Sequence, residues 1–138
     1  MSRSVVVAVD GSPQTDRVLD AAVAYAKRAD LPLTVVHVRE LEVVGKAGAV
    51  WSEEHSETAA IAARAVEHCK AQGVVADPVT ASARLGHVAR AIADIAHDRD
   101  AEVIVVGTRG HSQITRLLVG STATKLLHIT DRPMLVIP

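Results

Sequence analysis

Four short apolar runs that lack polar alternation constrain this fold more than any other feature of the chain. The runs are SVVVAV at 4–9, LTVVHV at 33–38, VIVV at 103–106 and MLVI at 134–137. A strand with one solvated face alternates apolar and polar residues, whereas a strand covered on both faces is apolar throughout. The runs therefore predict buried strands of a parallel sheet. A weaker run, VVADPVT at 74–80, contains Pro78, which has no N–H for a ladder, so we expect this strand at an edge.

Helical patterns separate these strands. Ser12 and Pro13 are typical of an N-cap and the first helical residue. Further patterns predict helices over about 53–72, over 87–99 and from Gly120–Ser121 onward. Strands that alternate with helices favour right-handed crossovers and helices on both faces of the sheet. We therefore predict a Rossmann-like α/β fold and a single domain over residues 1–138.

Composition and charge narrow the function classes. The net charge is −1, with acidic and basic residues mixed along the chain, which predicts no surface for nucleic acid and no basic patch for a membrane. The single cysteine, Cys69, is typical of a reducing compartment. No run approaches the roughly 20 apolar residues of a membrane span, and the first run is too short for a signal peptide. We expect a soluble, cytoplasmic protein.

Two connections exceed the usual few residues, at 39–52 and 107–119, and long ordered loops of this kind are often lids or binding loops. Ligands of open parallel sheets bind at the carboxyl ends of the strands. If the strands at 4–9 and 103–106 are neighbours, Asp10 faces Gly107 across that crevice. Residues 120–122 then begin a helix whose N–H groups and positive dipole end suit an anion. The residues alone predict a phosphate site, in which Asp10 would suit ribose hydroxyls or a metal ion carried with the phosphates.

The glycine spacing matches neither the Walker loop nor the dinucleotide fingerprint. The pattern Gly107-x2-Gly110-x9-Gly120-Ser121 instead resembles the phosphate-binding signature of the universal stress protein family, in its ATP-binding branch. VVVAVDGS, LTVVHV and the ending RPMLVIP are also similar to that family, and the resemblance covers the whole chain. It implies the fold of the adenine nucleotide alpha hydrolases, with a five-stranded parallel sheet in the order 3-2-1-4-5.

The resemblance also implies a set of nucleotide-binding residues. They are Asp10, Val38, Gly107, Arg109, Gly110, Gly120, Ser121 and Thr122. In this scheme Asp10 lies near the ribose and phosphates, the backbone of Val38 meets the adenine edge, and the remaining residues surround the phosphates. The implied ligand is ATP with Mg²⁺, and the implied function is a nucleotide-dependent module of the stress response.

Simpler interpretations remain open for several of these residues. Asp10 could cap a turn with Gly11, Arg109 could be a solvated charge, and Ser121 could serve only as a helix N-cap. Trp51 could flank the adenine or pack at a subunit contact. The seven histidines show no close metal-ligand spacing, so we expect no metal site built from side chains alone.

The sequence also allows two other functions, and it predicts a homodimer. A slow ATP hydrolase would need a general base, for which Asp10 and His111 are the candidates. A protein whose loop binds no nucleotide would act through interactions alone. Because the strand at 134–137 would leave an uncovered edge, we predict a homodimer formed through it, a geometry that the family resemblance also implies. Cys69 lies on the apolar stripe of its helix, which indicates a buried thiol.

Overall fold

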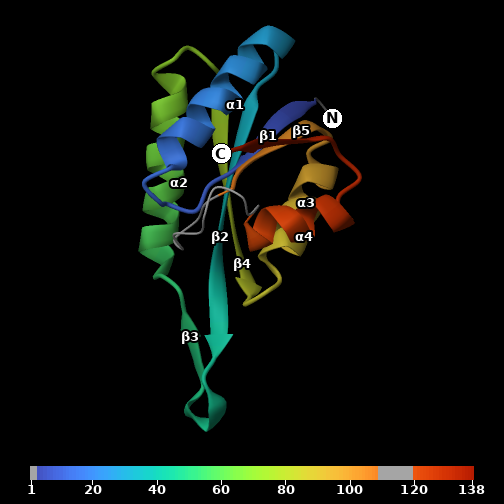
Figure 1. Cartoon of the computed structure of the whole chain (residues 1–138). Helices are drawn as coiled ribbons and strands as arrows, with labels where there is room; N and C mark the ends of the chain where they lie inside the picture. Colours follow the sequence, from blue (N-terminus) through green and yellow to red (C-terminus); the bar gives the residue numbers. More distant parts are fainter. Residues whose placement is uncertain (1–2, 109–119) are drawn as a thin grey trace.

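A computed structural model describes residues 3–108 and 120–138 (Figure 1). The elements in chain order are β1 (Ser4–Ala8), α1 (Thr15–Ala29), β2 (Leu33–Val43), η1 (Gly45–Ala47), β3 (Ala49–Trp51), α2 (His55–Lys70), β4 (Ala76–Arg84), α3 (Val88–Asp98), β5 (Ala101–Gly107), α4 (Ser121–Ile129) and β6 (Met134–Ile137). All five predicted strands are present, and β6 has the predicted bounds.

The parallel strands lie in the order β4-β2-β1-β5-β6. Counted along the chain, this is the predicted order 3-2-1-4-5, with β1 beside β5 at the centre. The number of strands was wrong, because the sheet has six: β3 pairs antiparallel with the far end of β2. Within the described residues β4 pairs only with β2, which confirms the edge position inferred from Pro78.

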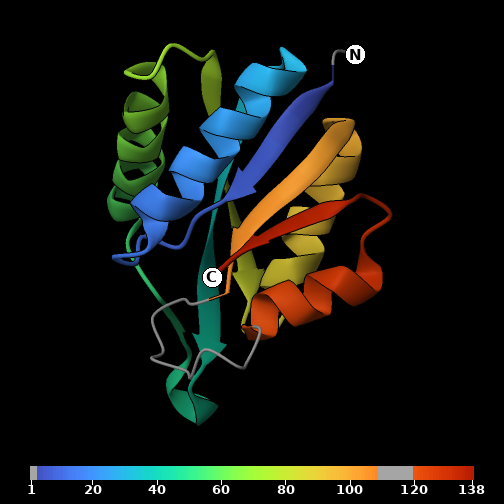
Figure 2. The same ribbon diagram turned by 45° about the horizontal axis from the view of Figure 1, so that its top comes forward.

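Helices cover both faces of the sheet, as predicted (Figures 1 and 2). On one face α1 and α2 pack through Leu19 and Val66 against alternate strand residues such as Val7. On the other face α3 and α4 pack through Ile92 and Leu126. The central strands are therefore apolar on both faces, which accounts for their unalternated runs.

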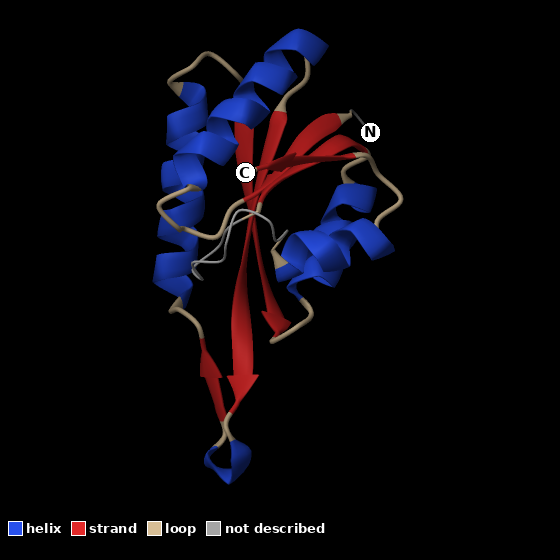
Figure 3. Ribbon diagram, viewed as in Figure 1, coloured by secondary structure: helices blue, strands red, loops and turns tan. Residues whose placement is uncertain are grey.

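The connection 39–52 is not the long loop that the sequence predicted. Residues 39–43 continue β2, of which residues 39–41 still pair with β4. β3 returns antiparallel beside residues 41–43 to form a ribbon that extends from the sheet (Figure 3). The ribbon is fixed at its base, where the N–H of Glu40 donates to Ser52 Oγ at 2.9 Å and the N–H of Ser52 donates to Glu40 O at 2.7 Å. The guanidinium of Arg39 lies 3.9 Å above the ring of Trp51.

The helix ends differ from the predictions by a few residues. The first helix begins at Thr15 with Gln14 as its N-cap, two residues later than Ser12 and Pro13 predicted. Ser12 still shapes the turn, because its hydroxyl accepts the Gln14 N–H at 3.3 Å. The last helix begins at Ser121, as expected. No helix in the part of the chain that the structure describes is long and apolar enough to cross a membrane.

Candidate functional site

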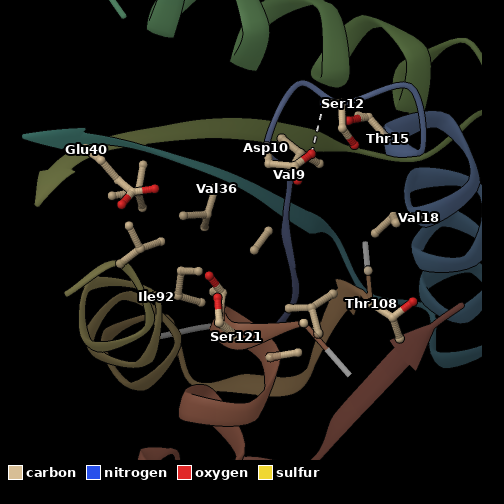
Figure 4. Close-up of a pocket in the computed structure, with 18 residues that line it drawn as sticks. Val9, Asp10, Ser12, Thr15, Val18, Val36, Glu40, Ile92, Thr108 and Ser121 are labelled. Carbon is tan, nitrogen blue, oxygen red and sulfur yellow. Dashed lines mark hydrogen bonds between the residues drawn. The ribbon is translucent and has the colours of Figure 1, made fainter. Parts of the chain in front are cut away.

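A cavity of about 350 Å³ lies at the carboxyl ends of β1, β2 and β5 (Figure 4). Its floor comes from the sheet, and the N-terminal ends of α3 and α4 form the opposite wall. The residues that line it include Asp10, Val36, Val38, Glu40, Ile92, Gly107, Thr108, Gly120, Ser121 and Thr122. The position is the one at which open parallel sheets bind their ligands.

Asp10 enters this cavity from the turn that follows β1. Its Oδ1 accepts the N–H of Ser12 at 2.9 Å, and Gly11 takes the left-handed conformation that the turn requires, with φ of 76°. The capping role that the sequence left open for Asp10 is therefore present. The same side chain also lines the cavity, so capping the turn and facing a ligand are compatible.

Gly120 allows the N-terminus of α4 to approach the end of β5 very closely. A Cβ atom at Gly120 would lie 2.6 Å from the backbone oxygen of Thr108. Thr108 is itself held by β6, because its N–H donates to Ile137 O at 2.9 Å. Glycine is therefore the residue that the contact requires, for a steric reason rather than a dihedral one.

The N-cap of α4 is Gly120 and not Ser121, which corrects that alternative. In the described part of the chain no side chain caps this helix by a hydrogen bond. The first N–H groups of a helix have no partner within the helix and carry its positive dipole end. Because Gly120, Ser121 and Thr122 line the cavity, this end of α4 suits an anionic group there.

The edge of β2 that borders the cavity has a gap at Val38. Val36 O accepts the Val9 N–H at 2.9 Å, and Glu40 O accepts the Ser52 N–H at 2.7 Å. Since alternate residues of a strand direct their backbone groups to the same side, the N–H and C=O of Val38 point toward this edge too. Among the described residues, no backbone hydrogen bond at this edge involves Val38. One donor and one acceptor are thus presented side by side between the end of β1 and the base of the ribbon.

A buried polar cluster lies behind this edge, on the α2 face of the sheet. His37 is only 4% exposed; its Nδ1 lies 2.7 Å from Val9 O, and its Nε2 lies 2.5 Å from Glu53 Oε1. Thr58 donates its hydroxyl to the same carboxylate oxygen at 2.8 Å. Both ring nitrogens of this interior histidine are therefore hydrogen-bonded within the protein. Sequence reasoning did not single out Glu53, which it placed only at the start of the predicted helix over 53–72. The histidine inside the apolar run 33–38 was the signal that a polar partner would be needed.

Six of the predicted site residues line the cavity together, namely Asp10, Val38, Gly107, Gly120, Ser121 and Thr122. Arg109 and Gly110 lie outside the described residues, as does His111. Sequence reasoning missed Glu40, because it was assigned to a loop; alternation with Val36 and Val38 along a longer strand would have found it.

Other candidate residues lie elsewhere. Trp51 is on the ribbon and is not one of the residues that line the cavity. Cys69 is fully buried in the α2 face of the core, and burial, followed by the nearby charge of Asp20, raises the pKa of its thiol to about 11. Within residues 3–108 and 120–138, no three histidine, cysteine or carboxylate side chains gather as metal ligands would.

The fold and the cavity define a Rossmann-like α/β protein with its ligand crevice at the carboxyl ends of the central strands. The model of the universal stress protein family matches residues 1–138, and the chain belongs to this family. The expected resemblance is therefore confirmed.

Relatives of known sequence and structure agree with this assignment. The chain is 31% identical over 150 residues to universal stress protein YxiE of Bacillus subtilis, with 99% of each chain covered. It is 34% identical over 142 residues to a universal stress protein of Mycolicibacterium smegmatis, of which it spans 47%, about half. A universal stress protein from Archaeoglobus fulgidus superposes with a TM-score of 0.79 at 27% identity, over 100% of both chains. The universal stress protein from Archaeoglobus fulgidus in complex with dAMP gives 0.75 at 26% identity, covering 99% of this chain and 98% of that one.

Proposed function

We propose that the protein is an adenine-nucleotide-binding module of the stress response, whose bound state regulates other components. One observation carries this proposal: a donor–acceptor edge at Val38, the Asp10 carboxylate and the N-terminus of α4 all line one cavity. These three features match the base, the ribose and the phosphates of one nucleotide. The solved relative in complex with dAMP supports the same ligand class.

The base is assigned to the edge at Val38. The Watson–Crick edge of adenine places its N6 amino donor next to the N1 acceptor, which complements a backbone C=O beside a backbone N–H. The apolar side chains of Val36, Val38 and Ile92 surround this part of the cavity. An apolar pocket with a few fixed polar groups is typical of small-molecule sites, and about 350 Å³ is within their usual size range.

The phosphates are assigned to the end of β5 and the start of α4, where Gly107, Gly120, Ser121 and Thr122 line the cavity. Arg109 and Gly110 belong to this part of the proposal by the family signature. ATP is the proposed ligand, with Mg²⁺ as its cation. Among the described side chains Asp10 is the carboxylate placed to share such an ion with the phosphates, and the first turn of α4 would supply positive potential to them.

The test begins with the protein as purified. One Trp and one Tyr give it weak near-ultraviolet absorbance, so a retained adenine nucleotide would dominate the spectrum. Denaturation and mass spectrometry would identify the released ligand, and calorimetry on stripped protein would rank ATP, ADP and AMP. No released nucleotide and no heat with any of the three would refute the proposal and favour a protein that acts through interactions alone. Single-turnover assays with Mg²⁺ and ATP, with Asp10→Ala as the control, would test slow hydrolysis.

We also propose a homodimer through β6. Ile104 and Thr108 donate to the carbonyls of Pro133 and Ile137, so the backbone groups of Met134 and Val136 face away from β5. In the described part of the chain no strand pairs with this outer edge. Uncovered edges of this kind are templates for pairing with a second chain, and a second β6 would satisfy it.

A further inference from the structure

The regular pairing of β1 with β2 stops one rung early. Val5 N–H donates to Pro32 O and Val9 N–H donates to Val36 O, so β1 pairs with the even-numbered residues of β2. In a parallel ladder the next rung would join the Val38 N–H to Val9 O. That rung is not among the backbone hydrogen bonds of the described residues.

His37 occupies the acceptor that this rung would use. Its Nδ1 lies 2.7 Å from Val9 O. A carbonyl oxygen only accepts, so Nδ1 carries the proton and donates. The Val9 carbonyl is therefore directed to the α2 face of the sheet, away from the Val38 N–H.

The imidazole is held in this orientation from its other end. Nε2 lies 2.5 Å from Glu53 Oε1, which also accepts the Thr58 hydroxyl at 2.8 Å. His37 and Thr58 are 4% and 2% exposed. Arg39, the other charged group at this point, has its Nη1 3.5 Å from the backbone oxygen of Glu53, just before α2. A buried ring with both nitrogens bonded has one stable orientation.

We infer that His37 is a positioning residue, which removes the Val9 carbonyl from the ladder and so leaves the Val38 N–H available to a ligand. This inference rests on the proposed function, because the ligand group it serves is the acceptor on the base edge. Glu53 and Thr58 act through His37 by fixing its ring. A histidine that merely filled the core would not alter the hydrogen bonding of Val38.

Two variants separate these roles. The amide nitrogen of Asn reaches the position of Nδ1, so His37→Asn keeps the bond to Val9 O. The amide of Gln extends to the position of Nε2, so His37→Gln keeps the contact with Glu53 and releases the Val9 carbonyl. Amide hydrogen exchange of Val38, followed by NMR without nucleotide, reads the consequence directly.

We expect the Val38 amide to exchange faster than the Val36 amide in wild type and in His37→Asn. In His37→Gln the missing rung forms, and Val38 exchange slows about tenfold, the factor that corresponds to one backbone hydrogen bond of about 1.4 kcal/mol. AMP affinity falls by about the same factor in His37→Gln, because Val38 must leave Val9 before it binds the base. In His37→Asn the AMP affinity stays within about twofold of wild type.

The wild-type protein alone already tests the geometry. A Val38 amide as protected as that of Val36 before nucleotide is added would overturn the inference, and so would unchanged Val38 exchange in His37→Gln. Thermal unfolding of both variants separates lost stability from lost positioning. If the exchange pattern is as expected but none of AMP, ADP and ATP binds wild type, the ladder role of His37 is supported and the proposed function is refuted.

Discussion

Replacement of Gly120 by alanine tests the phosphate end of the site most sharply. The new Cβ would lie 2.6 Å from Thr108 O, and contacts below 3.0 Å essentially do not occur, so the two groups must separate by at least about 0.4 Å. Thr108 is anchored to β6 through its N–H, so the N-terminus of α4 has to move. That movement displaces the N–H groups of Ser121 and Thr122 from the proposed phosphates.

The size of the effect follows from the bonds that would be lost. A hydrogen bond from a backbone N–H to a charged group contributes about 1.5–3 kcal/mol, so misplacing one of them weakens binding by roughly 10- to 150-fold. Calorimetric titration with ATP measures this change, and circular dichroism establishes that the variant is folded. Gly73→Ala is the matched control, since Gly73 has φ of 89°, no atom within 4 Å of its Cβ position and no place in the cavity lining. The control should destabilise the fold without changing the ATP affinity. A folded Gly120→Ala variant that binds ATP as tightly as wild type would refute the steric reasoning.

Three further predictions use separate parts of the molecule. Val136→Pro removes an N–H that faces away from β5, so sedimentation should give a monomer, while a wild type that already sediments as one chain would refute the dimer. Burial raises the pKa of the Cys69 thiol from 9.0 to about 11, so the stability gained by keeping this thiol neutral is fully present below pH 9 and is lost as the pH rises toward 11. The free energy of unfolding of Cys69→Ala, measured by chemical denaturation, should lack this alkaline loss. An identical pH profile for the two proteins would contradict the assignment of the loss to Cys69. Trp51→Phe should leave the ATP affinity within about twofold, because Trp51 does not line the cavity, and a tenfold loss in calorimetry would show that the ring contacts the ligand.

The sequence predicted most of the fold because the strands are buried on both faces. Runs such as VVV in β1 and VIVV in β5 have no alternative placement, and their alternation with helices selects a parallel sheet. The ribbon was missed for a local reason. Residues 42–46 and 48–51 are exposed, so the run of buried apolar residues that marks the other strands ends before the ribbon does.

The sequence predicts those parts of the candidate site that depend on residue type. It does not predict those that depend on which backbone groups are hydrogen-bonded to one another. Asp10 and Gly120 follow from their positions at a strand end and a helix start. The family resemblance assigned the backbone of Val38, but the reason that Val38 has an open edge lies in the pairing of Val9 with His37. Such a detail depends on which rung of a ladder is missing, and the sequence pattern contains no sign of that.

We propose that ATP binds between the end of β1 and the start of α4. The most direct measurement is a titration of ¹⁵N-labelled protein with ATP and Mg²⁺, followed through the backbone amide shifts. We expect saturable changes at Asp10–Ser12, Val38, Gly107 and Gly120–Thr122, with β6 and the tip of the ribbon little affected. Unchanged shifts at these residues in saturating ATP, or changes concentrated on another face, would contradict it.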